Sequence, residues 1–305
     1  MTEATPMSDE LTAIVEMIRV SGLTDASLTL AERSALLDLD SPVPEGTTVE
    51  VLDAGAVGFR GEWIAAPDST SDRAVVHLHG GAYTAGGPGS HRPFAAELSA
   101  GAGCPVLLLD YRLAPADPFP AAFNDALAAY RWLCGSNGKG LDPASIVISG
   151  DSAGGGLAAA VLVALRDEGT DLPAGAVLLS PWTDLALSGG SHATQDGLDP
   201  ICSTATLTQS VQAYVPKGVD VRDPRVSPLY SDLNDLPPLL IHVGEVEVLR
   251  DDAVSFAERA TAAGTEVELL VAPGLVHVWH LFSGIAPEST RDLAVVTEWI
   301  RARTS

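Results

Sequence analysis

The sequence predicts an α/β protein built on one mostly parallel sheet with helices on both faces. Short apolar segments alternate with helical segments from Arg73 onward, which is the pattern of a parallel sheet covered on both sides. At 305 residues, with 46% hydrophobic and 19% charged residues, the chain can bury one large core or two of medium size. No internal repeat or low-complexity tract interrupts the alternation.

Two helices are expected before the sheet, at 11–20 and 28–39, because apolar residues recur there at helical spacing. Prolines and a glycine at 41–46 end this part, and a short antiparallel strand pair follows at 49–52 and 61–65. Further strands are expected at 74–79, 106–110, 146–150, 176–180, 239–244 and 267–271, which makes eight, and helices at 92–102, 121–134, 157–168, 251–263 and 290–303.

One interval, 181–238, lacks a convincing strand and contains a helical run at 206–214. It is too long for an ordinary connection in an α/β sheet. We expect it to pack with the N-terminal helices over the carboxyl ends of the strands, where open α/β sheets place their ligands. The predicted division is N-terminal cap helices at 1–45, core at 46–184, cap insertion at 185–225 and the rest of the core at 226–305.

Charge and cysteine content narrow the class of protein. A formal net charge of −23 argues against binding to nucleic acid or to anionic membranes, because the field of the protein would repel both. Cys104, Cys134 and Cys202 lie far apart without metal-ligand spacing, and we expect free thiols and no metal. The sequence has no signal-peptide pattern and no apolar run of transmembrane length, which predicts a soluble cytoplasmic protein.

The residues Gly150, Ser152 and Gly154 have the spacing of a nucleophile elbow between a β-branched strand and a helix. Small residues flank the serine in such an elbow because a tight turn leaves no room for side chains beside it. The same pattern also fits a glycine-rich turn with a capping serine. A catalytic reading therefore requires a base, an orienting carboxylate and oxyanion donors elsewhere in the chain.

Donors for an oxyanion are expected in the bend that follows the strand ending at His79. The backbone N–H groups of Gly80 and Gly81, together with that of Ala153 after the nucleophile, form the predicted oxyanion hole. The alternative is a simple strand-ending turn.

The base is expected late in the chain, after the last strand, where His277 and His280 are the candidates. His277 lies nearer the strand end and is the predicted base, whereas His280 is expected to be structural or at the surface. The loop after 239–244 offers the orienting carboxylates. Asp251 and Asp252 fit the N-terminal turn of a helix, and spacing alone does not separate Glu245 from Glu247.

These motifs resemble those of the hormone-sensitive-lipase-like (family IV) esterases of the α/β-hydrolase superfamily. The family's His-Gly-Gly-Gly signature corresponds to 79–82, with Ala82 in place of the third glycine, and its Gly-Asp-Ser-Ala-Gly-Gly elbow is 150–155. Segments 110–115 and 118–120 match the family's strand-to-helix region, where Ala116 stands in the usual place of a glutamate.

The resemblance implies an α/β-hydrolase fold with a helical cap and a serine carboxylesterase without metal or organic cofactor. It selects Glu247 as the orienting carboxylate and His277 as the base of Ser152. The small cap of the family implies esters with short to medium acyl chains, and the family often pairs through the last strand and helix, here near 267–271 and 290–303. The alternatives are a non-catalytic small-molecule binding protein on the same scaffold, or an amidase or lactonase with the same triad.

Overall fold

The computed structural model describes residues 7–37 and 41–304. Within them, eight strands form one sheet, as predicted. They are β1 (Thr48–Leu52), β2 (Gly61–Ala65), β3 (Ala74–Leu78), β4 (Val106–Leu109), β5 (Ile146–Asp151), β6 (Gly175–Leu179), β7 (Leu239–Val246) and β8 (Val267–Val276).

The strand order is β1-β2-β4-β3-β5-β6-β7-β8. Only β2 runs against its neighbours: it pairs antiparallel with both β1 and β4, and the other pairs are parallel. The antiparallel pair at the edge and the parallel remainder are both as the sequence predicts. Since β5, β6, β7 and β8 are consecutive neighbours, the residues that follow them meet at one edge of the sheet.

The helices among the described residues are α1 (Asp9–Ser21), α2 (Leu30–Leu37), α3 (Ala54–Val57), α4 (Pro88–Ala102), α5 (Ala121–Cys134), α6 (Ala153–Asp167), α7 (Ser191–Thr194), α8 (Thr204–Tyr214), α9 (Arg250–Ala262) and α10 (Pro287–Arg303). Short 3₁₀ turns occur at Pro143–Ser145, Pro228–Tyr230 and Trp279–Phe282. Residues 38 and 39 of the helix predicted at 28–39 lie outside the described residues. No helix within the described ranges is long and apolar enough to cross a membrane.

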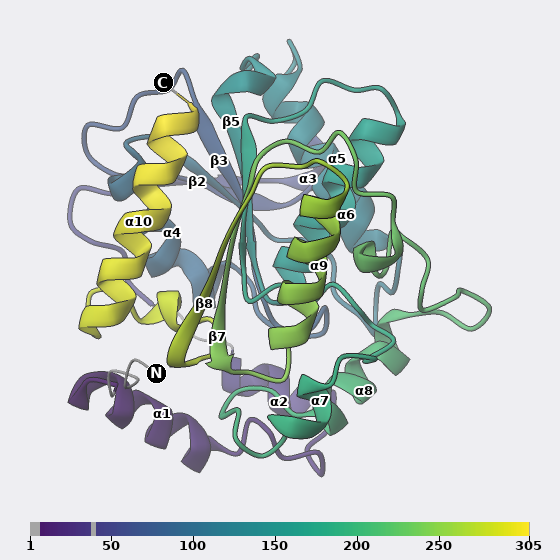
Figure 1. The fold of residues 1–305 in the computed structure, drawn as a ribbon. Helices are drawn as coiled ribbons and strands as arrows, with labels where there is room; N and C mark the ends of the chain where they lie inside the picture. Colours follow the sequence, from purple (N-terminus) through teal and green to yellow (C-terminus); the bar gives the residue numbers. More distant parts are fainter. Residues whose placement is uncertain (1–6, 38–40, 305) are drawn as a thin grey trace.

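Both faces of the sheet are buried along its central strands, whereas the edge strand β1 is mostly exposed. Figure 1 shows α4 and α10 on one face and α5, α6 and α9 on the other. Successive residues of β3 alternate between them, so that Val75 packs with the first group while Val76 and Leu78 pack with the second. This two-sided burial explains why the central strands β3, β4 and β6 consist almost entirely of apolar residues.

The N-terminal helices α1 and α2 lie together with α7 and α8 of the 181–238 interval at one end of the sheet (Figure 1). Arg33 of α2 donates to Gln209 Oε1 of α8 at 2.9 Å, and Arg19 of α1 donates to the carbonyl of Leu198 at 2.8 Å. Helix α8 also reaches the core, because the rings of Tyr214 and Tyr83 stack with centroids 3.9 Å apart. These contacts support the predicted cap, and the exact domain boundaries stay a prediction.

Several elements differ from the predicted bounds, and two of these differences bear on the site. Helix α6 begins at Ala153 rather than at Leu157, so Gly154, Gly155 and Gly156 are helical, whereas Gly150 lies in β5. Strand β8 continues to Val276 through a bulge opposite β7, beyond the predicted end at residue 271. The extension carries the chain directly to His277.

Candidate active site

Ser152 is the first residue after β5 and precedes α6 directly. Its backbone has φ 54° and ψ −121°, a conformation that non-glycine residues seldom adopt, and its amide donates to the carbonyl of Leu179 at 2.8 Å. This strained turn is the local signature of a nucleophile elbow. The side chain is thereby held above the edge of the sheet.

The glycines around Ser152 are required by close backbone approach. A Cβ on Gly150 would lie 2.3 Å from the carbonyl oxygen of Gly154, and one on Gly154 would lie 1.9 Å from that of Leu78. Such distances are far below any van der Waals contact, so only glycine allows α6 to begin this close to β3 and β5.

His277 is the first residue after β8 and lies beside Ser152. Its Nε2 is 2.9 Å from Ser152 Oγ, and its Nδ1 is 2.8 Å from Glu247 Oε2. In neutral histidine one ring nitrogen donates and the other accepts. The tautomer that donates from Nδ1 to the carboxylate leaves Nε2 free to accept the serine proton.

Glu247 is the first residue after β7, and it is fully buried. Its Oε1 accepts hydrogen bonds from Ser180 Oγ at 2.8 Å and from the backbone N–H of Gly244. Glu245 is exposed, and its carboxylate accepts the N–H of Gly274 instead. The geometry thus separates the two glutamates that spacing left open.

Asp251 and Asp252 occupy the first turn of α9, as predicted. Their carboxylates accept backbone N–H groups of neighbouring loops, at Ser191 for Asp251 and at Thr183 and Asp184 for Asp252. His280 is buried rather than at the surface, and its Nε2 lies 2.9 Å from His242 Nδ1. The structure therefore places these candidates in supporting contacts.

Burial and charge shift the protonation of the Glu247 and His277 pair. Burial raises the pKa of Glu247. Burial alone would lower the pKa of His277, but Cys202 and Glu247 beside its ring raise that pKa well above its ordinary value. Burial also raises the pKa of the Cys202 thiol, which is then neutral at pH 7, so the lasting charge beside the imidazole is that of Glu247.

The predicted oxyanion donors require one correction. The N–H of Gly80 donates to Asp151 Oδ1 at 3.0 Å, so it is already occupied and does not face the nucleophile as a free donor. Across the described part of the chain, the N–H groups of Gly81, Ala82 and Ala153 have no hydrogen-bond acceptor. Gly81 and Ala82 have φ values of 116° and 55°, which turn the backbone sharply after β3.

Sequence reasoning missed a buried cluster behind this loop. Asp151 accepts from Gly80 and also contacts His77 Nε2 at 3.2 Å and His91 Nε2 at 3.3 Å. Burial disfavours the charged carboxylate, but His91 and His77 hold the pKa of Asp151 well below its ordinary value. The only signal in the sequence was that Asp151 directly precedes Ser152, because the pairing of His77 with Ser149 across β3 and β5 is visible only in the structure.

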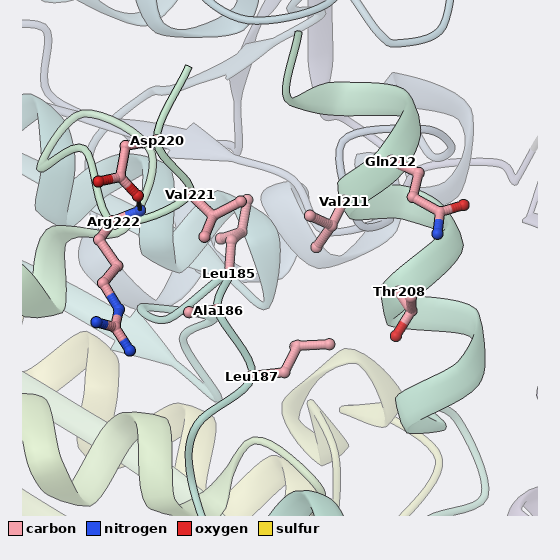
Figure 2. Close-up of a pocket in the computed structure, with 9 residues that line it drawn as sticks. All are labelled: Leu185, Ala186, Leu187, Thr208, Val211, Gln212, Asp220, Val221 and Arg222. Carbon is pink, nitrogen blue, oxygen red and sulfur yellow. Dashed lines mark hydrogen bonds between the residues drawn. The ribbon is translucent and has the colours of Figure 1, made fainter. Parts of the chain in front are cut away.

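A cavity of about 590 Å³ lies in the cap between α8, residues 185–187 and residues 220–222 (Figure 2). Leu185, Val211 and Val221 point into it, and Arg222 lies at its side. Ser152 and His277 are not among the described residues that line it. Helix α8 borders both this cavity and the loop after β3, where Ser210 Oγ lies 3.3 Å from Thr84 Oγ1.

Comparisons with known proteins identify the family of the chain. Residues 75–281 match a family model described as alpha/beta hydrolase fold. The chain is 44% identical to an acetyl-hydrolase of Streptomyces hygroscopicus over 262 residues, which cover 86% of this chain and 84% of the relative.

Solved structures are similar along almost the whole chain. One is an esterase from the bacterial hormone-sensitive lipase family, with TM-score 0.92 and 40% identity, covering 99% of this chain and 100% of the other. Another is EstE5 soaked by p-nitrophenyl butyrate, with TM-score 0.91 and 36% identity, covering 97% and 99%.

Proposed function

The chain belongs to the α/β-hydrolase fold family, among the esterases related to hormone-sensitive lipase, and we propose that it hydrolyses carboxylic esters with Ser152, His277 and Glu247 as its catalytic triad. The observation that supports this most strongly is the continuous pair of hydrogen bonds from Ser152 Oγ through the imidazole to Glu247 Oε2, at 2.9 and 2.8 Å. Ser152 follows β5, Glu247 follows β7 and His277 follows β8. All three residues therefore lie at the same edge of the sheet.

The chemistry follows from the positions of these atoms. His277 Nε2 takes the Ser152 proton as Oγ attacks the ester carbonyl, and Glu247 stabilises the imidazolium. The imidazolium then gives that proton to the departing alcohol, which leaves an acyl group on Ser152. Water, deprotonated by the same ring, attacks the acyl carbonyl, and the proton returns to Ser152 Oγ as the carboxylic acid is released.

The tetrahedral intermediates carry a negative oxygen that needs preorganised donors. We assign this role to the N–H groups of Gly81, Ala82 and Ala153, because they have no other acceptor in the described part of the chain. The N-terminus of α6, which begins at Ala153, adds its dipole at the same place. The N–H of Gly80 instead donates to Asp151 and so holds the start of the loop after β3 in place.

For substrates, we propose esters with short to medium acyl chains. The acetyl-hydrolase relative and the soaking of EstE5 with p-nitrophenyl butyrate support small acyl groups. We also propose that α1, α2, α7 and α8 form a cap over the site. A series of p-nitrophenyl esters tests the proposed acyl-chain preference. We expect kcat/KM to peak below about ten acyl carbons, as a pocket of ordinary size implies. A rate that still rises with longer chains would refute the assignment.

The catalytic assignment is tested with Ser152→Ala and a matched control, Ser145→Ala. Ser145 lies in the turn before β5 and donates to the carbonyl of Asp142, away from the triad. We expect p-nitrophenyl butyrate hydrolysis and fluorophosphonate labelling to disappear in the first variant and to persist in the second. An unchanged rate in Ser152→Ala contradicts the proposal.

The alternative functions are tested separately. A panel of esters, amides and lactones shows which acyl bond is preferred. A folded protein that binds ligands without turnover or labelling supports a binding protein instead.

We further propose a homodimer through β8 and α10, since β8 is an edge strand and both elements carry exposed apolar side chains. Leu269 of β8 is 40% exposed and Val295 of α10 is 47% exposed. Light scattering coupled to size-exclusion chromatography measures the mass directly. A monomer at all accessible concentrations contradicts this assembly.

A further inference from the structure

Ser180 is the first residue after β6, the strand between that of the nucleophile and that of Glu247. It is fully buried, and its backbone N–H donates to the carbonyl of His242 at 2.7 Å. Its φ of 48° lies in the left-handed region, which glycine and asparagine occupy more readily than serine. The hydrogen bonds of its side chain can explain why a serine occupies this conformation.

The Ser180 hydroxyl makes two hydrogen bonds at once. It donates to Glu247 Oε1 at 2.8 Å and accepts the backbone N–H of Val278 at 3.1 Å. Val278 directly follows His277 and is itself in the left-handed region, with φ 48°. One buried oxygen therefore joins the acid after β7 to the loop that carries the base after β8.

These bonds restrict the conformation of the acid. A glutamate has one more rotatable bond than an aspartate, so its carboxylate needs additional contacts to hold one orientation. Ser180 and the amide of Gly244 both bond to Oε1, which leaves Oε2 directed at His277 Nδ1. Since the same hydroxyl also fixes Val278, the acid and the base are positioned relative to each other by a single group.

We propose that Ser180 is a positioning residue of the triad, whose hydroxyl holds the Glu247 carboxylate and the His277 loop in register. This inference rests on the proposed esterase function. Ser180 contacts neither substrate nor the reacting oxygen in this role. It acts through the geometry of the two groups that do the proton transfer.

The test compares Ser180→Ala with Ser180→Gly. Both remove the hydroxyl, but glycine relaxes the backbone at positive φ, so agreement between the variants separates the hydroxyl from backbone strain. Misplacement of catalytic groups by about 1 Å can reduce rates about a hundredfold. We expect kcat to fall about tenfold to a hundredfold in both variants, while KM changes less than about threefold.

The pH profile distinguishes positioning from a purely structural role. If Glu247 is no longer directed at His277, the imidazolium is less stabilised and the pKa of His277 falls. The acid limb of kcat/KM should then move to lower pH in both variants. An unchanged limb or one that moves to higher pH, or a wild-type kcat in either folded variant, overturns the proposal.

Ser99→Ala is the matched control. Ser99 is also fully buried, and its hydroxyl accepts the N–H of Ala66 at 2.9 Å and donates to the carbonyl of Cys104 at 2.8 Å, on the far side of the sheet from α6. We expect Ser99→Ala to have a lower melting temperature, an unchanged kcat and an unchanged pH profile.

The outcomes distinguish this inference from the proposed function. If the wild type is active and Ser152→Ala is inactive, normal kinetics in the Ser180 variants refute this inference alone. If the wild type is inactive on all esters, the proposed function itself fails. Should Ser180→Ala not fold, Ser180→Gly carries the comparison.

Discussion

The carboxylate of Asp151 accepts the backbone N–H of Gly80 at 3.0 Å, which ties the residue before the nucleophile to the start of the loop after β3. The bond fixes the first amide of that loop, whereas the following amides, those of Gly81 and Ala82, have no acceptor within the described residues. The two halves of the proposed site, nucleophile and oxyanion donors, are therefore connected through one buried side chain.

We expect Asp151→Ala to reduce kcat about tenfold to a hundredfold with a smaller change in KM, because the loop loses its anchor. Asp151→Asn is expected to lose less, since its amide oxygen can still accept from Gly80. Steady-state kinetics on p-nitrophenyl butyrate measures both. Equal activity of Asp151→Ala and the wild type would show that the anchor is dispensable.

Asp199 connects the cap to the acid. Its Oδ2 accepts the N–H of Val248, which follows Glu247, at 3.0 Å, while Oδ1 accepts those of Ile201 and Cys202. We expect Asp199→Ala to reduce kcat because the loop that carries Glu247 is released. Asp196→Ala is the control, since the exposed Asp196 carboxylate caps only Thr204 in the same segment. Equal rates in the two variants would contradict a link between cap and acid.

The pKa of His277 is raised well above 6.5 by its neighbours, and the base must be neutral to accept the serine proton. Activity should therefore rise with pH through a limb above pH 6.5. Glu247→Gln removes the charge that stabilises the imidazolium, so its limb should lie at lower pH, with kcat reduced about a thousandfold or more. The pH dependence of kcat/KM measures both effects, and a limb below pH 6 in the wild type is incompatible with them.

Two buried histidines predict how stability depends on pH. Burial lowers the pKa of His79 to about 3 and that of His242 to about 4, so both are neutral in the folded protein at pH 5. The unfolded chain binds protons on these groups below about pH 6.5, and the folded chain does not. The contribution of these two groups to stability is therefore complete above about pH 6.5 and falls as pH decreases toward 4, by up to about 1.4 kcal/mol per pH unit for each histidine.

Urea unfolding between about pH 7 and pH 4.5 measures this loss. His242→Asn keeps a polar group opposite His280 Nε2 but removes one titrating ring. Its unfolding free energy should fall less steeply with decreasing pH than that of the wild type. Parallel curves for the two proteins would show that His242 does not contribute.

The sequence predicted the fold well because apolar strands and helical periodicity are local properties. Strand existence, the antiparallel pair at the edge and the parallel remainder all agree with the structure. The position of Ser152, His277 and Glu247 near the ends of predicted strands was also visible in the chain. Spacing alone left the choice between Glu245 and Glu247 open, and the burial of Glu247 with its hydrogen bond to His277 supports the proposed assignment.

The supporting groups could not be predicted because they depend on which strands are neighbours. Ser180 is an isolated serine after a strand, and only the order β5-β6-β7-β8 places it between the nucleophile and the acid. The Gly80 amide was expected to face the cavity, but the side chain of Asp151 turns back and accepts from it. Such contacts are tertiary, and no local pattern encodes them.

The last prediction concerns Gly154, which the sequence pattern places in the turn of the elbow but which lies inside α6. A Cβ at Gly154 would lie 1.9 Å from the carbonyl oxygen of Leu78, which cannot move without breaking β3 from the sheet. We expect Gly154→Ala to lower the unfolding free energy by about 3 kcal/mol or more and to abolish esterase activity. Gly140→Ala is the comparison: its φ is 64°, but nothing lies within 4 Å of an added Cβ. Gly140→Ala introduces backbone strain without a steric clash. We therefore expect its free energy of unfolding to fall by about 1 kcal/mol and its esterase activity to be unchanged. If Gly154→Ala were as stable and active as Gly140→Ala, close packing of α6 on β3 could not be the reason for glycine in the elbow.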